Sequence, residues 1–184
     1  MELKMQVVSR LRSFPDHRPG HGVRYPLSSI ILLVLFGFLS GRDSLAGVYR
    51  FGRTLTKPQL KRLGMRRGTS PCHSAITEAF HGINVAALTQ IFGSIVLKNK
   101  GNKPIHLSID GKTLCGSKNK GDKGVHILHA FAGELGGVID QIQVSGKTNE
   151  AKAMLDLLDK LEFDNTIITG DAMFCQKDIV KKNP

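Results

Sequence analysis

The sequence predicts an α+β protein, with a basic helical part over residues 1–98 followed by an α/β part over residues 104–184. Two observations carry this prediction. The excess of positive charge lies in the first part, and the hydrophobic pattern changes from helical spacing to alternation near residue 104. The length of 184 residues, with 41% hydrophobic and 22% charged residues, is typical of a globular chain with one sizeable or two small domains.

The charge is strongly asymmetric along the chain. Residues 1–103 carry 16 lysines and arginines against 4 acidic residues, a net charge of +12. Residues 104–184 carry 10 lysines against 11 acidic residues, a net charge of −1, so the two parts account for the total of +11. All ten arginines of the chain lie in the first part, and arginine favours bidentate contact with phosphate. This asymmetry indicates a nucleic-acid partner.

The first helix is expected after an irregular start. Residues 1–26 are rich in proline and glycine in their second half, which predicts turns. The apolar run Ile30–Leu39 predicts a buried helix that Ser28 and Ser29 cap and Gly41 ends. This run is about half of the length that a bilayer span requires, so no membrane partner is expected.

The rest of the first part also has helical spacing. A helix is expected near Ser44–Thr54, then a short basic turn in Leu60–Gly68. The next helix is predicted to begin with Ser70 as its N-cap and Pro71 in its first position. This arrangement is compatible with a helix-turn-helix and equally with a plain helical bundle.

A polar, glycine-containing segment, Lys98–Lys103, predicts the domain boundary. Beyond it the expected order is β-β-β-α-β-α, with a hairpin loop in Gly133–Gly137. The helix is capped by Thr148 or Asn149 and has one apolar stripe. The predicted strands are Ile105–Asp110, Gly124–Ala132, Val138–Val144 and Thr166–Thr169, the helix follows residue 149, and Gln176–Lys182 begins another helix.

Two acids lie at corresponding places, each where a predicted strand ends. Asp110 follows PIHLSI and Asp171 follows TIITG. A right-handed crossover would bring the two strands together in parallel, and both carboxylates would then emerge at the same edge. Such a pair suits a hard divalent cation, and two such ions can assist phosphodiester chemistry. The alternative is that both acids only cap loops, since Asp110-Gly111 is also a good turn pair.

Other metal and nucleotide sites find no support. The three cysteines are far apart and form no C-x-x-C motif, which argues against a disulfide framework or zinc ribbon and indicates a cytoplasmic protein. His126 and His129 are three apart on a predicted strand and should face opposite sides. No phosphate-binding loop with the Gly-x-x-x-x-Gly-Lys pattern occurs.

Four ordered motifs resemble the H-repeat-associated group of bacterial insertion-sequence transposases, which belong to the DDE class. The motifs are Pro15–Arg18 with Arg24–Leu27, Ile109–Leu114, Lys147–Glu150 and Gly170–Gln176. The resemblance implies a helical associated domain, an RNase H-like catalytic domain, and magnesium- or manganese-dependent cleavage and joining of DNA. It matches Asp110 and Asp171 to the first two catalytic, metal-binding acids. Glu150 is read as a helix-dipole acid, the alternative being that it lines the site.

The chain departs from the family pattern at its end. These transposases complete the site with a glutamate well beyond the second aspartate, whereas this sequence ends at Pro184. We therefore expect a truncated copy with an incomplete RNase H-like domain, weak metal binding, and open apolar surface around Ile167, Ile168 and Phe174. The alternatives are a DNA-binding protein derived from a transposase that does not cut, and an unrelated RNA-associated basic protein.

The expected partner is double-stranded DNA, both element ends and target, and a homodimer is compatible with the sequence. A nucleoid-associated location follows from that partner. Arg66 and Arg67 are candidate phosphate contacts in the first part. Lys112 and Gln176 are candidates beside the two acids.

The net charge of +12 predicts DNA binding that weakens steeply with salt, because each neutralised phosphate releases counterions. Replacing Arg66 and Arg67 together should reduce the slope of log affinity against log salt by about two units if both contact phosphates. Fluorescence anisotropy over a salt series measures this slope. An affinity independent of salt would rule out the phosphate contacts, and an unchanged slope in the double variant would assign both arginines to a solvated face.

Overall fold

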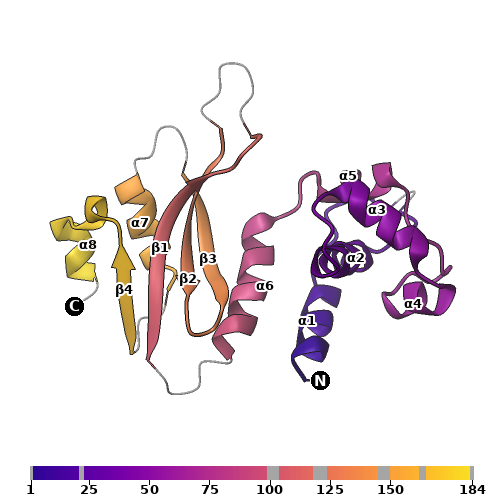
Figure 1. Ribbon diagram of the computed structural model, residues 1–184, viewed down its shortest axis with the longest axis horizontal. Coiled ribbons are helices and arrows are strands. Elements are labelled where there is room, and N and C mark those ends of the chain that lie inside the picture. Colours follow the sequence, from indigo (N-terminus) through magenta and orange to yellow (C-terminus); the bar gives the residue numbers. More distant parts are fainter. Residues whose placement is uncertain are drawn as a thin grey trace. The chain divides into compact units, whose positions relative to one another are not determined.

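The computed structural model describes residues 2–20, 23–98, 104–117, 124–144, 150–161 and 165–182. The chain forms two compact units, Met1–Val85 and Ala86–Pro184 (Figure 1). Helices in the first unit and a mixed four-stranded sheet in the second confirm the α+β class.

The first unit is built around α2, which contacts α1, α3 and α5. Helix α2 is apolar over most of its surface and is buried from Leu27 to Val34 apart from the half-buried Ser28. A helix that is apolar all round has to be enclosed by others. The helices of this unit are α1 (Glu2–Arg12), α2 (Leu27–Leu39), α3 (Leu45–Thr54), α4 (Lys57–Arg62) and α5 (His73–Phe80).

The expectation of an irregular start is wrong for α1. The turn-forming residues all lie beyond residue 14, whereas Glu2–Arg12 contains neither proline nor glycine. Leu11 is fully buried and Phe14 nearly so. The helix is therefore held by tertiary packing, which a local count of turn formers does not capture.

The start of α2 is also capped differently from the expectation. Pro26 occupies the N-cap position, and neither Ser28 nor Ser29 provides a side-chain cap. The cap comes from a distant residue, because the Asp16 carboxylate accepts a hydrogen bond from the Leu27 amide at 3.1 Å. Arg18 holds Asp16 in place with two guanidinium hydrogen bonds, of 2.9 and 2.7 Å. The Pro15–Arg18 motif therefore has a structural role in this unit.

The remaining helices of the first unit follow the expectations in part. Ser44 caps α3 by accepting a hydrogen bond from the Gly47 amide, and Gly41 adopts a positive φ of 77° just after α2. Helix α5 begins at His73 with Cys72 as its N-cap, two residues after the predicted start. Residues 63–72 separate α4 from α5, longer than a helix-turn-helix connection of three or four residues, which favours the helical-bundle alternative.

The second unit has a mixed sheet in the order β3-β2-β1-β4. Strands β1 and β2 are antiparallel, as are β2 and β3, and β4 runs parallel to β1. The parallel pairing predicted for the first and last strands is therefore found. The elements of this unit are α6 (Val85–Lys98), β1 (Ile105–Thr113), β2 (His126–Ala132), β3 (Gly137–Val144), α7 (Glu150–Leu158), β4 (Thr166–Gly170), the short 3-10 helix η1 (Ala172–Phe174) and α8 (Lys177–Lys182).

Helix α6 differs from the expected division of the chain, since the sequence places it with the helical part. In the structure it packs on the sheet. A Cβ at Gly93 would collide with the carbonyl oxygen of Ile139, and Val96 contacts the buried residues of the sheet. The boundary between the compact units accordingly lies at the start of α6, after Val85, whereas the expected linker residues 99–103 lie outside the described residues.

One face of the sheet forms the core of the second unit. Ile105, Leu107 and Ile109 alternate along β1 and are at most 3% exposed. Helix α7 packs against this face at the Ile109 end with a fully buried Leu157. The predicted caps of α7, Thr148 and Asn149, lie outside the described residues.

The opposite face of the sheet is exposed at β1 and β4. His106, Ser108 and Asp110 on β1 and Ile167 on β4 are exposed, the last at 63%. The expectation of open apolar surface holds for Ile167 but is wrong for Phe174, which is 5% exposed because it folds back into the core.

Within the described part of the chain, no single helix has the length and hydropathy needed to span a membrane, and only the bent pair His73–Phe80 with Val85–Lys98 meets those criteria jointly.

The cap on α2 predicts an acid-sensitive first unit. The side-chain hydrogen bond from Arg18 lowers the pKa of Asp16 to about 2. Because the pKa is lowered in the folded state, its stabilising contribution is present above about pH 4 and disappears as the pH falls toward 2. Asp16→Asn should lower the free energy of unfolding at pH 7 by about 1–2 kcal/mol, the range typical of lost caps. Urea denaturation at pH 7 and pH 3 should show a smaller difference at the lower pH; an equal difference would contradict this role.

Candidate metal and nucleic-acid site

The pairing of β1 with β4 places Asp110 and Asp171 at adjacent positions. Ile109 and Gly170 are Cα partners in the parallel ladder, and each acid follows one of them directly. Neighbouring strands lie about 4.8 Å apart, so the two acids lie side by side where the pairing of β1 with β4 ends. The expectation that Asp110 ends its strand is wrong, because β1 continues to Thr113 through its pairing with β2. The structure thus brings together two residues that are 61 positions apart in the sequence.

The two carboxylates have different surroundings. Both residues are exposed. The Asp110 carboxylate has no hydrogen-bond or ion-pair partner among the described residues, whereas that of Asp171 accepts a hydrogen bond from the Ala172 amide at 2.6 Å and caps η1. The loop-capping alternative therefore describes part of the role of Asp171 and none of that of Asp110.

The turn after β4 is fixed by an aromatic ring. A Cβ at Gly170 would lie 3.0 Å from the Phe174 ring, so the absence of a side chain lets the ring pack beneath the strand end. The buried ring holds η1 against the core and thereby positions Asp171 at its start. A small apolar cavity of about 170 Å³ beside Asp171 is lined by Met154, Ile168 and neighbouring residues.

His129 is a neighbour that sequence reasoning did not select as a site residue. It is the Cα partner of Asp110 across the antiparallel pair β1–β2 and lies on the same face of the sheet. His126 lies on the opposite face, opposite Thr113, so the expectation that the two histidines diverge is confirmed. The register of β2 against β1 was needed to find His129, because no local motif marks it.

Lys112 and Gln176 lie on the two segments that follow the acids. Lys112 is exposed and two residues beyond Asp110, hence on the same face of β1. Gln176 is exposed, and its side-chain amide donates to the Met173 carbonyl oxygen at 3.1 Å. The structure thus gives Gln176 a local turn contact.

A half-buried polar cluster lies on the face of β1 opposite Asp110. His126 Nδ1 lies 2.9 Å from Thr113 Oγ1, and His126 Nε2 lies 3.2 Å from Glu150 Oε1 without the alignment of a hydrogen bond. A Cβ at Gly111 would lie 2.8 Å from His126 Nε2 and 3.3 Å from Glu150 Oε2. Glu150 therefore contacts β2 and β1 from the first turn of α7, on the face opposite Asp110, and does not line the acid pair.

The acid pair has the oxygen ligands of a magnesium or manganese site with few protein ligands. Magnesium takes oxygen ligands, keeps several waters and is often held by only one or two carboxylates together with substrate phosphates. Exposed, adjacent Asp110 and Asp171 meet that requirement. Among the described residues no group of three histidines, cysteines or acids could enclose a metal ion.

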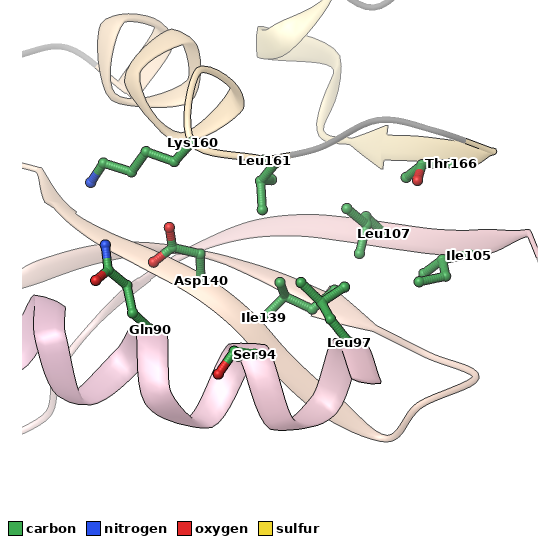
Figure 2. Close-up of a pocket in the computed structure, with 11 residues that line it drawn as sticks. Gln90, Ser94, Leu97, Ile105, Leu107, Ile139, Asp140, Lys160, Leu161 and Thr166 are labelled. Atoms are coloured by element: carbon green, nitrogen blue, oxygen red, sulfur yellow. The ribbon is translucent and has the colours of Figure 1, made fainter. Parts of the chain in front are cut away.

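A larger cavity of about 300 Å³ lies elsewhere, between α6 and the segment after α7 (Figure 2). Ile105, Leu107 and Ile139 form its apolar floor, and Asp140 and Lys160 lie at its polar side. Neither Asp110 nor Asp171 lines it. It follows that this cavity is separate from the candidate metal site.

Arg66 and Arg67 lie in the first unit, in the turn after α4. Both are exposed. Met65 is fully buried and anchors this turn, with its amide donating to the Leu60 carbonyl oxygen at 3.0 Å. The two arginines are therefore presented to solvent from a fixed backbone.

Two family models match the chain in succession. The model described as "DDE_Tnp_1-associated" matches residues 8–96, and the model described as "Transposase DDE domain" matches residues 101–184. Together they cover nearly the whole sequence. No solved structure shows a significant similarity to the chain.

Several curated proteins are similar over almost the full chain. "Putative protein YbfL" of Escherichia coli is 35% identical over 99% of this chain and 48% of its own length. "H repeat-associated putative transposase YhhI" of the same species is 33% identical over 99% and 48%. "H repeat-associated putative transposase YbfD" is 33% identical over 99% of this chain and 72% of its own length. The chain thus spans about half the length of the first two of these relatives.

The cluster behind Asp110 predicts an unequal response to alanine at two glycines of the second unit. Gly111→Ala should displace the His126 ring, which Thr113 and Glu150 hold, and lower the free energy of unfolding by about 1–2 kcal/mol. The matched control is Gly133→Ala, where a Cβ meets nothing within 4 Å, so the change should stay within about 0.5 kcal/mol. Urea denaturation compares the two; equal stabilities would show that the cluster does not confine β1.

Proposed function

We propose, for a chain that belongs to the H repeat-associated family of DDE transposases, that residues 86–184 contribute two metal-binding acids to DNA cleavage and strand transfer, and that residues 1–85 hold DNA. Asp110 and Asp171 are the catalytic and metal-binding residues of this proposal. The partners are double-stranded element ends and target DNA. A nucleoid-associated location and a homodimer are compatible with it.

The observation that carries the proposal is the register of β1 against β4. Ile109 and Gly170 are partners, so the two acids that follow them are adjacent where the pairing of β1 with β4 ends. Two like charges so close repel each other unless a cation or a proton lies between them. The Asp110 carboxylate, which is exposed and without a partner in the described part of the chain, is available for such a cation.

When bound, magnesium or manganese would polarise the scissile phosphodiester and assist the attacking oxygen. The chain's own residues would hold the metal ion and orient it. Asp110 presents its carboxylate from a strand whose far side is buried in the core, and Asp171 is fixed by its bond to the Ala172 amide. Lys112, exposed on the face that carries Asp110, supplies a positive charge for a DNA phosphate.

We further infer that the first unit supplies most of the affinity for DNA. Its excess of arginine and lysine attracts DNA phosphates whatever the base sequence of the DNA. Arg66 and Arg67 are the proposed contacts in this unit, and Gln176 joins Lys112 beside the acids. This assignment rests on charge and exposure.

A second candidate is a protein that binds DNA without cutting it. It is favoured by the observation that, within the described residues, no third ligand joins the two acids. It shares the fold and the DNA partner with the first candidate. Magnesium-dependent nicking separates them, because only the catalytic candidate cuts a duplex that carries an element end.

Isothermal titration with Mn²⁺ tests the acid pair. Asp110→Asn and Asp171→Asn should each weaken metal binding by about tenfold or more, since the loss of a second-shell partner alone often costs that much. Asp156→Asn, at an exposed acid on α7, is the matched control and should bind as the unchanged chain does. Equal heats for all four proteins would remove the proposed metal site.

A nicking assay on the same proteins tests the chemistry. The unchanged chain and the Asp156→Asn variant should nick an end-containing duplex when Mn²⁺ is present, and both site variants should not. If none of the proteins nicks DNA while all bind it, the second candidate is the better account.

A further inference from the structure

A pocket in the first unit lies where three of its segments meet. The end of α1, the start of α2 and the turn after α4 enclose a cavity of about 320 Å³. Its lining combines three cations with two serines and no acidic residue. The lining residues are Arg12, Pro26, Ser28, Ser29, Leu32, Lys61, Leu63, Gly64 and Arg66.

The three cations have no counterion. Arg12, Lys61 and Arg66 are exposed, and none of them has an acidic partner among the residues that the structure describes. The nearest acid along the chain, Asp16, is already bound by Arg18 and the Leu27 amide and does not line the pocket. The pocket therefore concentrates positive charge that an anion would neutralise.

Ser29 adds a buried polar group that points to a ligand. Its residue is only 2% exposed, it lines the pocket, and its hydroxyl has no hydrogen-bond partner in the described part of the chain. Among the described residues the fully enclosed side-chain atom without a partner is His126 Nε2, so the Ser29 oxygen remains accessible from the pocket. An oxyanion in the pocket would accept a hydrogen bond from it.

The start of α2 offers a second neutral donor. The amides of Ser29 and Ile30 donate to the Pro26 carbonyl oxygen, and that of Leu27 donates to Asp16. This leaves the Ser28 amide, in the first turn of a helix of 13 residues, without a partner among the described residues. Amides at a helix start are well placed to bind anions.

Gly64 fixes the wall opposite Ser29. It ends α4 with a positive φ of 91°, and a Cβ there would lie 2.5 Å from Ser29 Oγ. Only glycine permits both the left-handed backbone and this close approach. The wall opposite Ser29 is therefore main chain, and the two cations that flank Gly64 in the sequence, Lys61 and Arg66, line the same pocket.

We propose that this pocket binds one backbone phosphate of DNA, with Ser29 and the Ser28 amide as neutral donors and Arg12, Lys61 and Arg66 as the charges around it. The chemical class, a phosphate oxyanion, follows from the donors and cations of the pocket. The assignment to DNA rests on the proposed function. The pocket also separates Arg66, which lines it, from its neighbour Arg67, which does not.

The first experiment uses inorganic phosphate as the probe. Phosphate is titrated into the full chain at constant ionic strength while the amide resonances of Ser28, Ser29 and Gly64 are followed by NMR. We expect saturable shifts at these amides. Ser29→Ala and Arg66→Ala should each weaken phosphate binding by about tenfold, as hydrogen bonds to charged groups imply.

Arg53→Ala, at an exposed arginine that does not line the pocket, is the matched control and should bind phosphate within about twofold of the unchanged chain. Both arginines are exposed, so neither replacement should unfold the unit, and unchanged amide spectra elsewhere verify this. No shifts at the three amides, or equal affinities for all four proteins, would overturn the pocket.

The second experiment identifies the source of the phosphate. A short duplex DNA should displace inorganic phosphate from the three amides. Ser29→Ala should weaken DNA binding without changing its salt slope, because the hydroxyl is uncharged, whereas Arg66→Ala should reduce the slope by about one unit.

The outcomes separate this inference from the proposed function. Unchanged DNA affinity in both variants would overturn the pocket and leave DNA binding intact. If the pocket binds phosphate but DNA does not displace it, the assignment to DNA is wrong and a free phosphate is the ligand. A chain that does not bind DNA at all would contradict the proposed function, and the phosphate titration would still decide whether the pocket binds an oxyanion.

Discussion

The parallel pairing of β4 with β1 is the constraint on which the second unit depends. A parallel partner cannot be reached by a tight turn, so the chain has to cross over one face of the sheet, and α7 provides that crossing. The crossing helix buries the face that carries Ile109. The acids that follow Ile109 and Gly170 then lie together where this pairing ends, on the side of the sheet toward which both strands run. Core formation and site formation are thus results of the same strand pairing.

The first unit shows how a charged motif can be structural and still prepare a binding surface. Asp16 and Arg18 neutralise each other while the carboxylate caps α2 at Leu27. Because this acid is held by Arg18, it leaves the cations around the neighbouring pocket, Arg12 and Arg66 among them, without a counterion. The strongly basic composition of residues 1–103 is therefore divided between groups that hold the fold and groups that remain free to meet a phosphate.

Family membership and geometry support different parts of the functional picture. The two matched models and the H repeat-associated relatives place the chain among DDE transposases. The geometry adds what similarity does not state: that Asp110 and Asp171 are adjacent, that His129 lies opposite Asp110, and that Glu150 belongs to a support cluster behind β1. Glu150, at the start of α7, packs in that cluster because the missing side chain of Gly111 leaves space for its carboxylate beside His126.

The sequence by itself determined the fold class, the strands and the pair of acids, because alternation of apolar residues along Ile105–Asp110 and the turn formers between strands are local signals. It did not determine α1, the capping of α2 or the placement of α6. Each of these is decided by contacts between residues far apart in the sequence: Leu11 enters a core built by other helices, Asp16 reaches the Leu27 amide, and Gly93 lies against β3. The proposed phosphate pocket also depends on such contacts, since Ser29 in α2 and Gly64 after α4 line one pocket only when these distant segments pack together. Local patterns set which segments become helix or strand, and tertiary packing decided which polar groups were left buried, free and facing a common space.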